Sequence, residues 1–241
     1  MTEFPEAATP TVSVVVTSAG PPHRTLIQRE PTGTFHLGET LHGVVDEVAH
    51  LTPSKRPGLI ECKVRWRPAA LCLPEFEIDQ HDVQVLAERG MRFDLHLVRA
   101  AIGDGPSPSN LVLPSIRVEF IVRGKGFDPA ELTDAIGLGP DDISRSNPTR
   151  PKRLDTWTRG GLPVRSLDFA PLFAALLGEL VPKTQEIRRF CREHGATATF
   201  AFVTEVVDAA PNLAVSSDQF TTIAAFGASL WFDPYCRKEL E

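Results

Sequence analysis

The sequence predicts an α+β protein, in which an N-terminal, mainly antiparallel β domain is followed by an α+β domain with helices packed on one face of a mainly antiparallel sheet. Short apolar runs separated by proline and glycine turns fill residues 11–101, which is typical of antiparallel strands. Strand-like and helix-like segments alternate over residues 114–236. Between them, residues 102–113 are rich in glycine, proline and serine, which favours a linker.

The ends of the chain complete this division into domains. Residues 1–10 are acidic, small and proline-containing, so we expect a flexible arm there. Residues 237–241 are expected to form a short tail. A chain of 241 residues is long enough to build two hydrophobic cores.

The N-terminal strands differ in how clearly the sequence shows them. Residues 12–17 are strongly β-branched and precede a turn of glycine and proline. Residues 59–67 alternate between apolar and charged side chains, and residues 91–99 repeat the alternation, so each strand should cover a core on one side only. Residues 41–48 fit both a strand and a short helix imperfectly, and both interpretations remain open.

Helix signals are sharper in the C-terminal half. After a strand-like run, Asp128 can cap a helix that begins at Pro129 and ends at Gly137. Apolar positions recur at helical spacing over residues 167–180 and predict a longer helix. Pro182 interrupts that helix before a second one follows.

The chain closes with a strand, a helix and a last strand. Residues 197–207 predict the first strand, and Ser216 with Gln219 forms a capping box for the helix. Residues 228–232 form the last strand, whose alternation directs Trp231 to the side opposite its apolar neighbours. An exposed Trp231 would be the first candidate for a partner contact.

Composition limits the class of function. The chain is 42% hydrophobic and 23% charged, as in soluble globular proteins, and its formal net charge is -6. Residues 1–113 contribute 10 basic and 14 acidic residues, and the remainder contributes 15 and 17. Neither half has the basic excess that nucleic acid requires, so nucleic acid is an unfavoured partner. The sequence shows no signal peptide and no membrane span, and we expect a cytoplasmic protein.

Cysteine and histidine spacing gives no metal signature. The four cysteines contain no CxxC pair and are expected to be reduced thiols: Cys62, Cys72, Cys191 and Cys236. The histidines of the N-terminal half form neither HxH nor HExxH, and they include His36, His42, His50, His81 and His96. We therefore expect no metal ion and no cofactor.

A set of residues in the C-terminal half resembles, in its order and spacing, the pattern of a known family. It comprises Phe127-Asp128-Pro129, Leu132-Thr133, Ile136-Gly137-Leu138, Pro140, Trp157, Pro182, Pro211 and the run from Phe226 through Trp231 to Tyr235. Residues 116–236 resemble the bacterial domain of unknown function 4279 family, except for a proline-rich basic insertion around residues 147–153. The resemblance implies a small intracellular bacterial α+β domain and no known catalytic residues. Residues 1–113 resemble no family known to us.

The function that these observations favour is a non-enzymatic, cytoplasmic protein-binding module of inhibitor or immunity type, which acts through an acidic surface. Candidates for the partner contact are Trp231, Tyr235, Trp157, Arg150, Lys152 and Arg153. The partner is expected to be another protein, and the oligomeric state stays open.

Two alternatives remain at this point. A hydrolase or transferase could use Asp141, Asp142, Asp233 and Tyr235 at the domain junction, although the sequence has no GxSxG, Walker A, HExxH or GxGxxG motif. A nucleic-acid-binding protein could use the basic residues of the loop 145–165 around Trp157, if these gather on one face.

Overall fold

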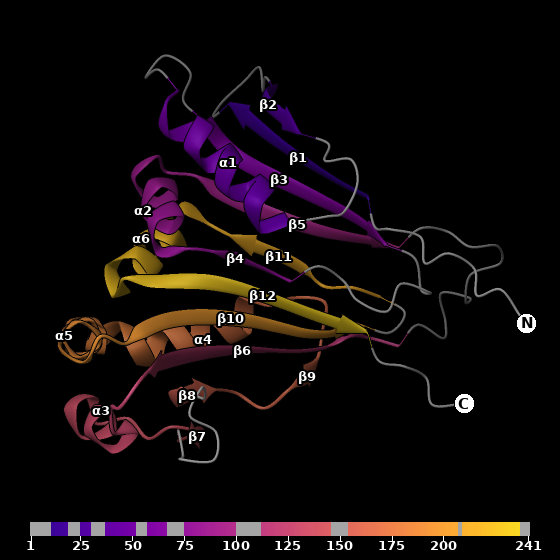
Figure 1. Cartoon of the computed structure of the whole chain (residues 1–241). Helices are drawn as coiled ribbons and strands as arrows, with labels where there is room; N and C mark the ends of the chain where they lie inside the picture. The colour runs from indigo at the N-terminus through magenta and orange to yellow at the C-terminus, as the bar shows by residue number, and fades with distance from the viewer. Residues whose placement is uncertain are drawn as a thin grey trace, which may run out of the picture.

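Two β-sheets, one above the other in Figure 1, organise the computed structural model of this protein. The structure describes residues 11–18, 25–29, 37–51, 57–66, 75–99, 112–145, 154–206 and 209–236. The predicted arm, the predicted tail and residues 102–111 of the predicted linker lie outside these ranges.

The upper sheet, called sheet A, has five strands within the described ranges, in the order β11-β5-β3-β1-β2. Their bounds are Thr11–Ser18 (β1), Thr25–Arg29 (β2), Pro57–Trp66 (β3), Arg92–Arg99 (β5) and Asn212–Val215 (β11). β1 runs antiparallel to β2 and β3, whereas β3 and β5 are parallel. The edge strand β11 comes from the other end of the chain and pairs antiparallel with β5.

The lower sheet, sheet B, has seven strands, six of them in the order β4-β12-β10-β6-β8-β7, while β9 also pairs with β6. Their bounds are Phe76–Ile78 (β4), Ser115–Gly124 (β6), Asp142–Ser144 (β7), Asp155–Gly160 (β8), Val164–Arg165 (β9), Thr197–Val206 (β10) and Ala228–Cys236 (β12). Among the described strands of sheet B, only β10 and β12 are parallel neighbours, so this sheet is mainly antiparallel.

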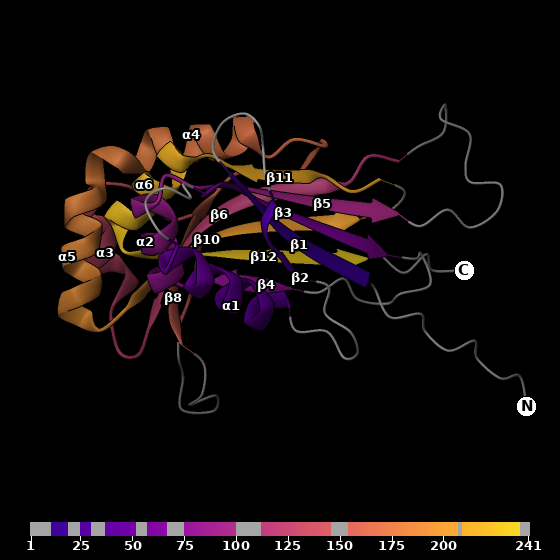
Figure 2. The ribbon, with the colours of Figure 1, turned by 90° about the horizontal axis from the view of Figure 1, so that it is seen from above.

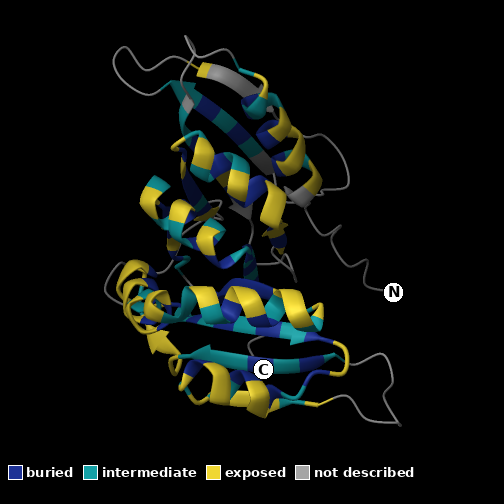
Figure 3. Cartoon of the chain, turned by 90° about the vertical axis from the view of Figure 1, so that its left-hand side faces the viewer, coloured by how far each residue is buried: buried dark blue, intermediate teal, exposed yellow. Residues whose placement is uncertain are grey.

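Helices cover the inner sides of the sheets. Their bounds are Leu37–Ala49 (α1), Gln80–Glu88 (α2), Pro129–Ile136 (α3), Ala170–Leu180 (α4), Thr184–His194 (α5) and Ser217–Phe226 (α6), and the 3₁₀ turn η2 (Val181–Lys183) joins α4 to α5. Seen from above, α1 and α4 lie on opposite sides of the strands (Figure 2). Each helix turns a buried stripe inward and an exposed one outward (Figure 3). No helix within the described ranges is both long and apolar enough to cross a membrane.

Phenylalanine rings from both sheets fill one continuous core. Phe200 of β10 packs 4.8 Å from Phe120 of β6 and 5.5 Å from Phe173 of α4, measured between ring centres. Phe76 of β4 packs 6.0 Å from Phe93 of β5 and 5.5 Å from Phe232 of β12, so its ring contacts a strand of each sheet. Because these rings belong to one cluster, neither sheet has a core of its own among the described residues.

The structure confirms the α+β class and the helices packed on one face of a mainly antiparallel sheet. Residues 41–48, for which the sequence left both a strand and a short helix open, form part of the helix α1. The structure also adds α2 over residues 80–88, a helix that the strand prediction for the N-terminal half did not contain. The predicted boundary separates the halves in sequence, but β4 joins the C-terminal sheet and β11 joins the N-terminal one.

Candidate partner-binding face

The side of sheet B that points away from the helices carries the candidate site, and we call it the outward face. β6 alternates strictly between buried and partly exposed residues, and its buried Phe120 faces Phe226 of α6. The residues on the opposite side of β6 are therefore outward. Register places the following side chains together on this face: Glu77 of β4, Ser229, Trp231, Asp233 and Tyr235 of β12, Thr199, Ala201, Val203 and Glu205 of β10, and Arg117, Glu119, Ile121 and Arg123 of β6.

Trp231 lies on the outward face one strand in from the edge strand β4. It lies between Ala201 of β10 and Glu77 of β4 in the register, and its side chain is half-buried. Tyr235, two residues further along the same side, is 43% exposed. The alternation that predicted an outward Trp231 is confirmed, since Leu230 and Phe232 are buried on the inner side. Two predicted partner-contact residues thus share one surface.

Ion pairs and hydrogen bonds hold the polar groups of the outward face in place. The Arg117 guanidinium lies 2.8 Å from Glu119, and that of Arg123 lies 3.9 Å from Glu77. The Ser229 hydroxyl donates to Glu77 at 2.6 Å. Glu77 therefore connects the short strand β4 to β12 in two ways, through its side chain and through backbone pairing.

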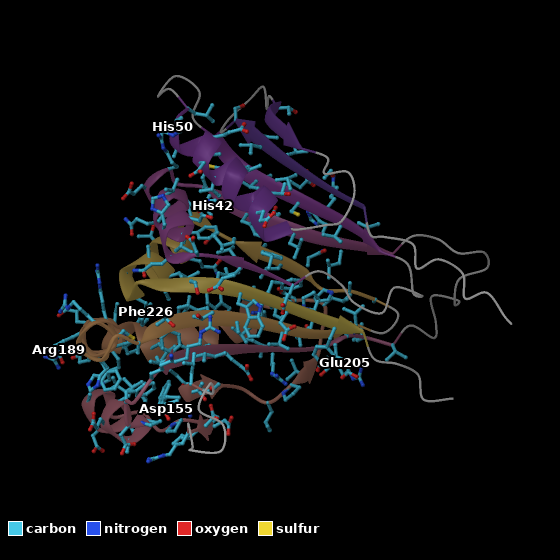
Figure 4. The ribbon with its side chains drawn as sticks, in the orientation of Figure 1. His42, His50, Asp155, Arg189, Glu205 and Phe226 are labelled. Carbon is cyan, nitrogen blue, oxygen red and sulfur yellow. The ribbon has the colours of Figure 1, made fainter. Side chains whose placement is uncertain are left out.

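Acidic groups outnumber basic ones on the outward face. On the described residues of β4, β12, β10 and β6, its carboxylates are Glu77, Glu119, Glu205 and Asp233, against the guanidinium groups of Arg117 and Arg123. The register of β9 and β7 adds Arg165 and Asp142 to the same face. Figure 4 marks Glu205 near the end of β10. Burial raises the pKa of Asp233, and the nearby Arg117 opposes that rise. A basic protein surface would complement this arrangement.

The other predicted contact residues lie elsewhere. Trp157 of β8 is fully buried and donates its indole N–H to the Thr133 hydroxyl of α3 at 3.1 Å, so it anchors α3 to the sheet. Arg150, Lys152 and Arg153 lie outside the described residues.

The described cations of the basic loop are already paired. Arg145 contacts Asp128 at 2.7 Å, and Arg159 contacts Glu179 at 2.7 Å and Asp141 at 3.2 Å. Arg165 donates to the Leu113 carbonyl at 2.7 Å. The carboxylates beside Arg145 and Arg159 offset part of the positive charge that this stretch could offer to a phosphate backbone, whereas the neutral Leu113 carbonyl leaves the charge of Arg165 in place.

The acids suggested for an enzyme site do not converge. Asp141 and Asp142 lie at β7, and three strands separate β7 from β12, which carries Asp233 and Tyr235. Asp141 also accepts hydrogen bonds from the Gly160 N–H and from Arg159. Its carboxylate is therefore used to fix the end of β8.

Within the described ranges, one group of side chains could hold a divalent cation. A ring nitrogen of His42 and carboxylate oxygens of Asp79 and Asp82 lie within 4.8 Å of one another. Asp79 caps α2 by accepting the Asp82 N–H at 2.8 Å, and His42 lies 2.9 Å from the Asp82 carboxylate. Figure 4 shows His42 where α1 meets α2. The contacts connect these two helices, a role that the sequence did not reveal because 40 residues separate the pair.

We expect the His42–Asp82 contact to make stability depend on pH. The hydrogen bond to Asp82 raises the pKa of His42, while burial raises the pKa of Asp82 more than His42 lowers it. A histidine with a raised pKa stabilises the fold fully below its unfolded pKa of about 6.5 and loses this effect as the pH rises through its folded pKa. The free energy of unfolding should therefore increase when the pH falls from about 8 to about 6.

Urea unfolding of wild type, His42→Gln and His50→Gln at these pH values checks this expectation. His50 follows the end of α1 and is exposed, which makes it a matched control. The increase should shrink in His42→Gln and persist in His50→Gln. Equal pH dependence in wild type and His42→Gln would contradict the expectation.

Both described free cysteines serve packing. Burial raises the pKa of Cys62 to about 12 and that of Cys191 to about 11, so both thiols stay protonated at neutral pH. Cys72 and His36 lie outside the described residues.

Comparison with known proteins gives one result. A family model described as a domain of unknown function (DUF4279) matches residues 114–237, about half of the chain, and confirms the resemblance seen in the sequence. Neither a curated protein nor a solved structure matches the chain.

Proposed function

Since this chain belongs to the family described as a domain of unknown function (DUF4279), whose description names no activity, we propose that it is a non-enzymatic protein-binding module. It binds a basic protein surface through the outward face of sheet B. An inhibitor or immunity-type protein in the bacterial cytoplasm is the form of this function that we favour.

The observation that carries the proposal is the position of the half-buried Trp231 on the side of sheet B opposite the buried phenylalanine rings of the described residues. Trp231 and Tyr235 supply aromatic area, and tyrosine and tryptophan are enriched among the residues that dominate binding energy. Strand β12 pairs with β10 along its length and with β4 at Leu230, Trp231 and Phe232, so the backbone beneath Trp231 is held on both sides before a partner arrives.

Charge supports the same partner class. On the described residues of β4, β12, β10 and β6, the four carboxylates of the outward face exceed its two guanidinium groups, and the formal net charge of the chain is -6. Opposite charge on a partner would speed association and make its rate fall with added salt. The scattered acids of the enzyme hypothesis offer no comparable arrangement.

Affinity measurements on outward-face variants test the proposal. The tagged full chain is used to isolate its partner from native cells, and the purified partner is titrated against wild type, Trp231→Thr, Tyr235→Thr and Val98→Thr. Threonine retains strand propensity. Val98 of β5, 41% exposed, lies on the outer side of sheet A and is the matched control for Tyr235.

We expect Trp231→Thr to raise Kd by about 10-fold or more, as for a central aromatic contact. Tyr235→Thr should raise Kd by a smaller factor, and Val98→Thr should leave it within about 2-fold, since residues outside the contact contribute little. Unchanged affinity in both sheet B variants would refute the outward face as the binding site. Turnover of a substrate by the purified chain, with no protein partner found, would favour the enzyme alternative.

A further inference from the structure

The two sheets repeat one connection pattern. In sheet A, β1 pairs antiparallel with β2 on one side and with β3 on the other, and β3 pairs parallel with β5. In sheet B, β6 pairs antiparallel with β8 and with β10, and β10 pairs parallel with β12. The chain order of these strands is the same in both halves, with α1 between the second and third strands of the first set and α4 and α5 between those of the second. The second set also contains α3 and β7 between its first two strands.

A strand followed by a helix stands between the last two strands of each set, and we call each such segment a strand–helix unit. The units are β4 with α2 and β11 with α6. Asp79 and Ser216 cap the two helices with extended backbone and a side-chain hydrogen bond to the third helical residue. Glycines with positive φ, Gly90 at 63° and Gly227 at 67°, follow both helices. The same sequence offset relates the two caps and the two glycines, so the units align without a gap.

The strand register of β4 and β11 agrees with this alignment, but each of the two strands pairs with a strand of the other half of the chain. Phe76 and Ile78 of β4 pair with Phe232 and Leu230 of β12, in the opposite half. At the equivalent positions, Leu213 and Val215 of β11 pair with Leu95 and Phe93 of β5. Each unit therefore joins the sheet of the other half in the same register.

We infer that residues 11–99 are a second, diverged copy of the domain that the family model matches at residues 114–237, and that the two copies bind each other by exchanging their strand–helix units. Each copy binds the strand–helix unit of the other copy along one edge of its own last strand. That strand is β5 in the N-terminal copy and β12 in the C-terminal copy. In Figure 1, α2 and α6 lie side by side where the two exchanged units meet, and these helices contact each other.

Divergence explains why the sequence hides the repeat. Over the aligned residues 76–95 and 213–232, only Ala87 with Ala224 and Gly90 with Gly227 are identical. The buried positions keep their apolar character, with Val83 and Leu86 of α2 equivalent to Phe220 and Ile223 of α6. A fold tolerates many substitutions in its core as long as the buried positions stay apolar and the total side-chain volume is kept.

The outer faces of the two copies have also diverged. Register makes Asp94 of β5 equivalent to Trp231 of β12, and Glu61 and Lys63 of β3 equivalent to Ala201 and Val203 of β10. The outer face of sheet A is thus charged where the outward face of sheet B is apolar. That the chain has one binding face, not two, rests on the proposed function.

Disulfide trapping in a cut chain tests the exchange. A protease site is inserted between Gly105 and Pro106 of the full chain, which is cleaved after folding. Two double variants are compared: Asp94→Cys with Ala214→Cys, which are register partners across the halves, and Asp94→Cys with Glu77→Cys. If each copy kept its own unit, Glu77 would take the place of Ala214 opposite Asp94.

We expect the first double variant to join the two fragments covalently on a non-reducing gel, because directly opposed residues lie close enough for a disulfide. The second should form no Asp94→Cys–Glu77→Cys disulfide within the N-terminal fragment. The opposite result in the two variants would overturn the exchange. Single-cysteine variants control for pairing with the native thiols.

Gel filtration of the cut wild-type chain gives an independent readout. Both fragments should elute together at the mass of the intact chain and separate only in denaturant. Two separately eluting, folded fragments would overturn the inference. Neither experiment uses the binding partner, so failure here and failure of the proposed function are distinguishable.

Discussion

Replacing Phe76 by alanine should lower the free energy of unfolding by about 3–5 kcal/mol, the usual loss for a buried phenylalanine. Phe76 is 3% exposed, and its ring packs against Phe93 in sheet A and Phe232 in sheet B. Its removal leaves a cavity between β5 of sheet A and β12 of sheet B, so both sheets should lose packing at once. Urea unfolding followed by circular dichroism measures the loss.

Amide hydrogen exchange shows whether the loss reaches both sheets. Exchange should accelerate in β5 and in β12 of Phe76→Ala. Phe127→Ala is the matched control, because Phe127 is 4% exposed and packs 5.6 Å from Phe190, within the C-terminal half. Its effect should centre on α3 and α5. Faster exchange confined to one sheet in Phe76→Ala would contradict a core shared by both halves.

Local signals account for the parts of the fold that the sequence predicts. Asp128 and Pro129 start α3, and Gly137 ends it in a left-handed conformation. The Ser216–Gln219 capping box forms as predicted and starts α6. Such features depend on neighbours within a few residues, so one sequence is enough to read them.

The missed helix α2 shows where local reading is weak. Val83 and Leu86 are its buried apolar residues, too few for a clear helical stripe in nine residues. Asp79 nevertheless caps it and Gly90 follows it, so a search for caps could have found it. The neighbouring strand β4 has three residues and pairs with a strand more than 150 positions away, which no local pattern encodes.

The candidate site was predicted in part for the same reason. Alternation along β12 is local and correctly directed Trp231 outward. Glu77 reaches the same face from the other half of the chain, and no spacing rule connects it to Trp231. β4 pairs with β12 in the same register in which β11 pairs with β5. The sequence of either short strand therefore does not indicate whether it will pair with β5 or with β12.

A second large effect is expected at Gly160, where β8 passes close to β6. A Cβ added at Gly160 would lie 2.5 Å from the Val118 carbonyl oxygen and 2.9 Å from the Glu119 Cα. Both atoms belong to the backbone of a paired strand, which cannot move aside without disturbing the β6–β8 pairing. Gly160→Ala should therefore lower the free energy of unfolding by about 1–3 kcal/mol, as overpacking does.

Gly161→Ala is the matched control, since a Cβ at Gly161 would meet no atom within 4 Å. That variant should remain within about 0.5 kcal/mol of wild type, as most surface substitutions do. Gly160 also donates its N–H to Asp141 at 2.8 Å, and Arg159 beside it pairs with Glu179. A shift of β8 would disturb these contacts too, so thermal unfolding of Gly160→Ala should depend less on salt than that of Gly161→Ala. Equal stability of the two variants would show that β6 and β8 can separate enough to admit a methyl group.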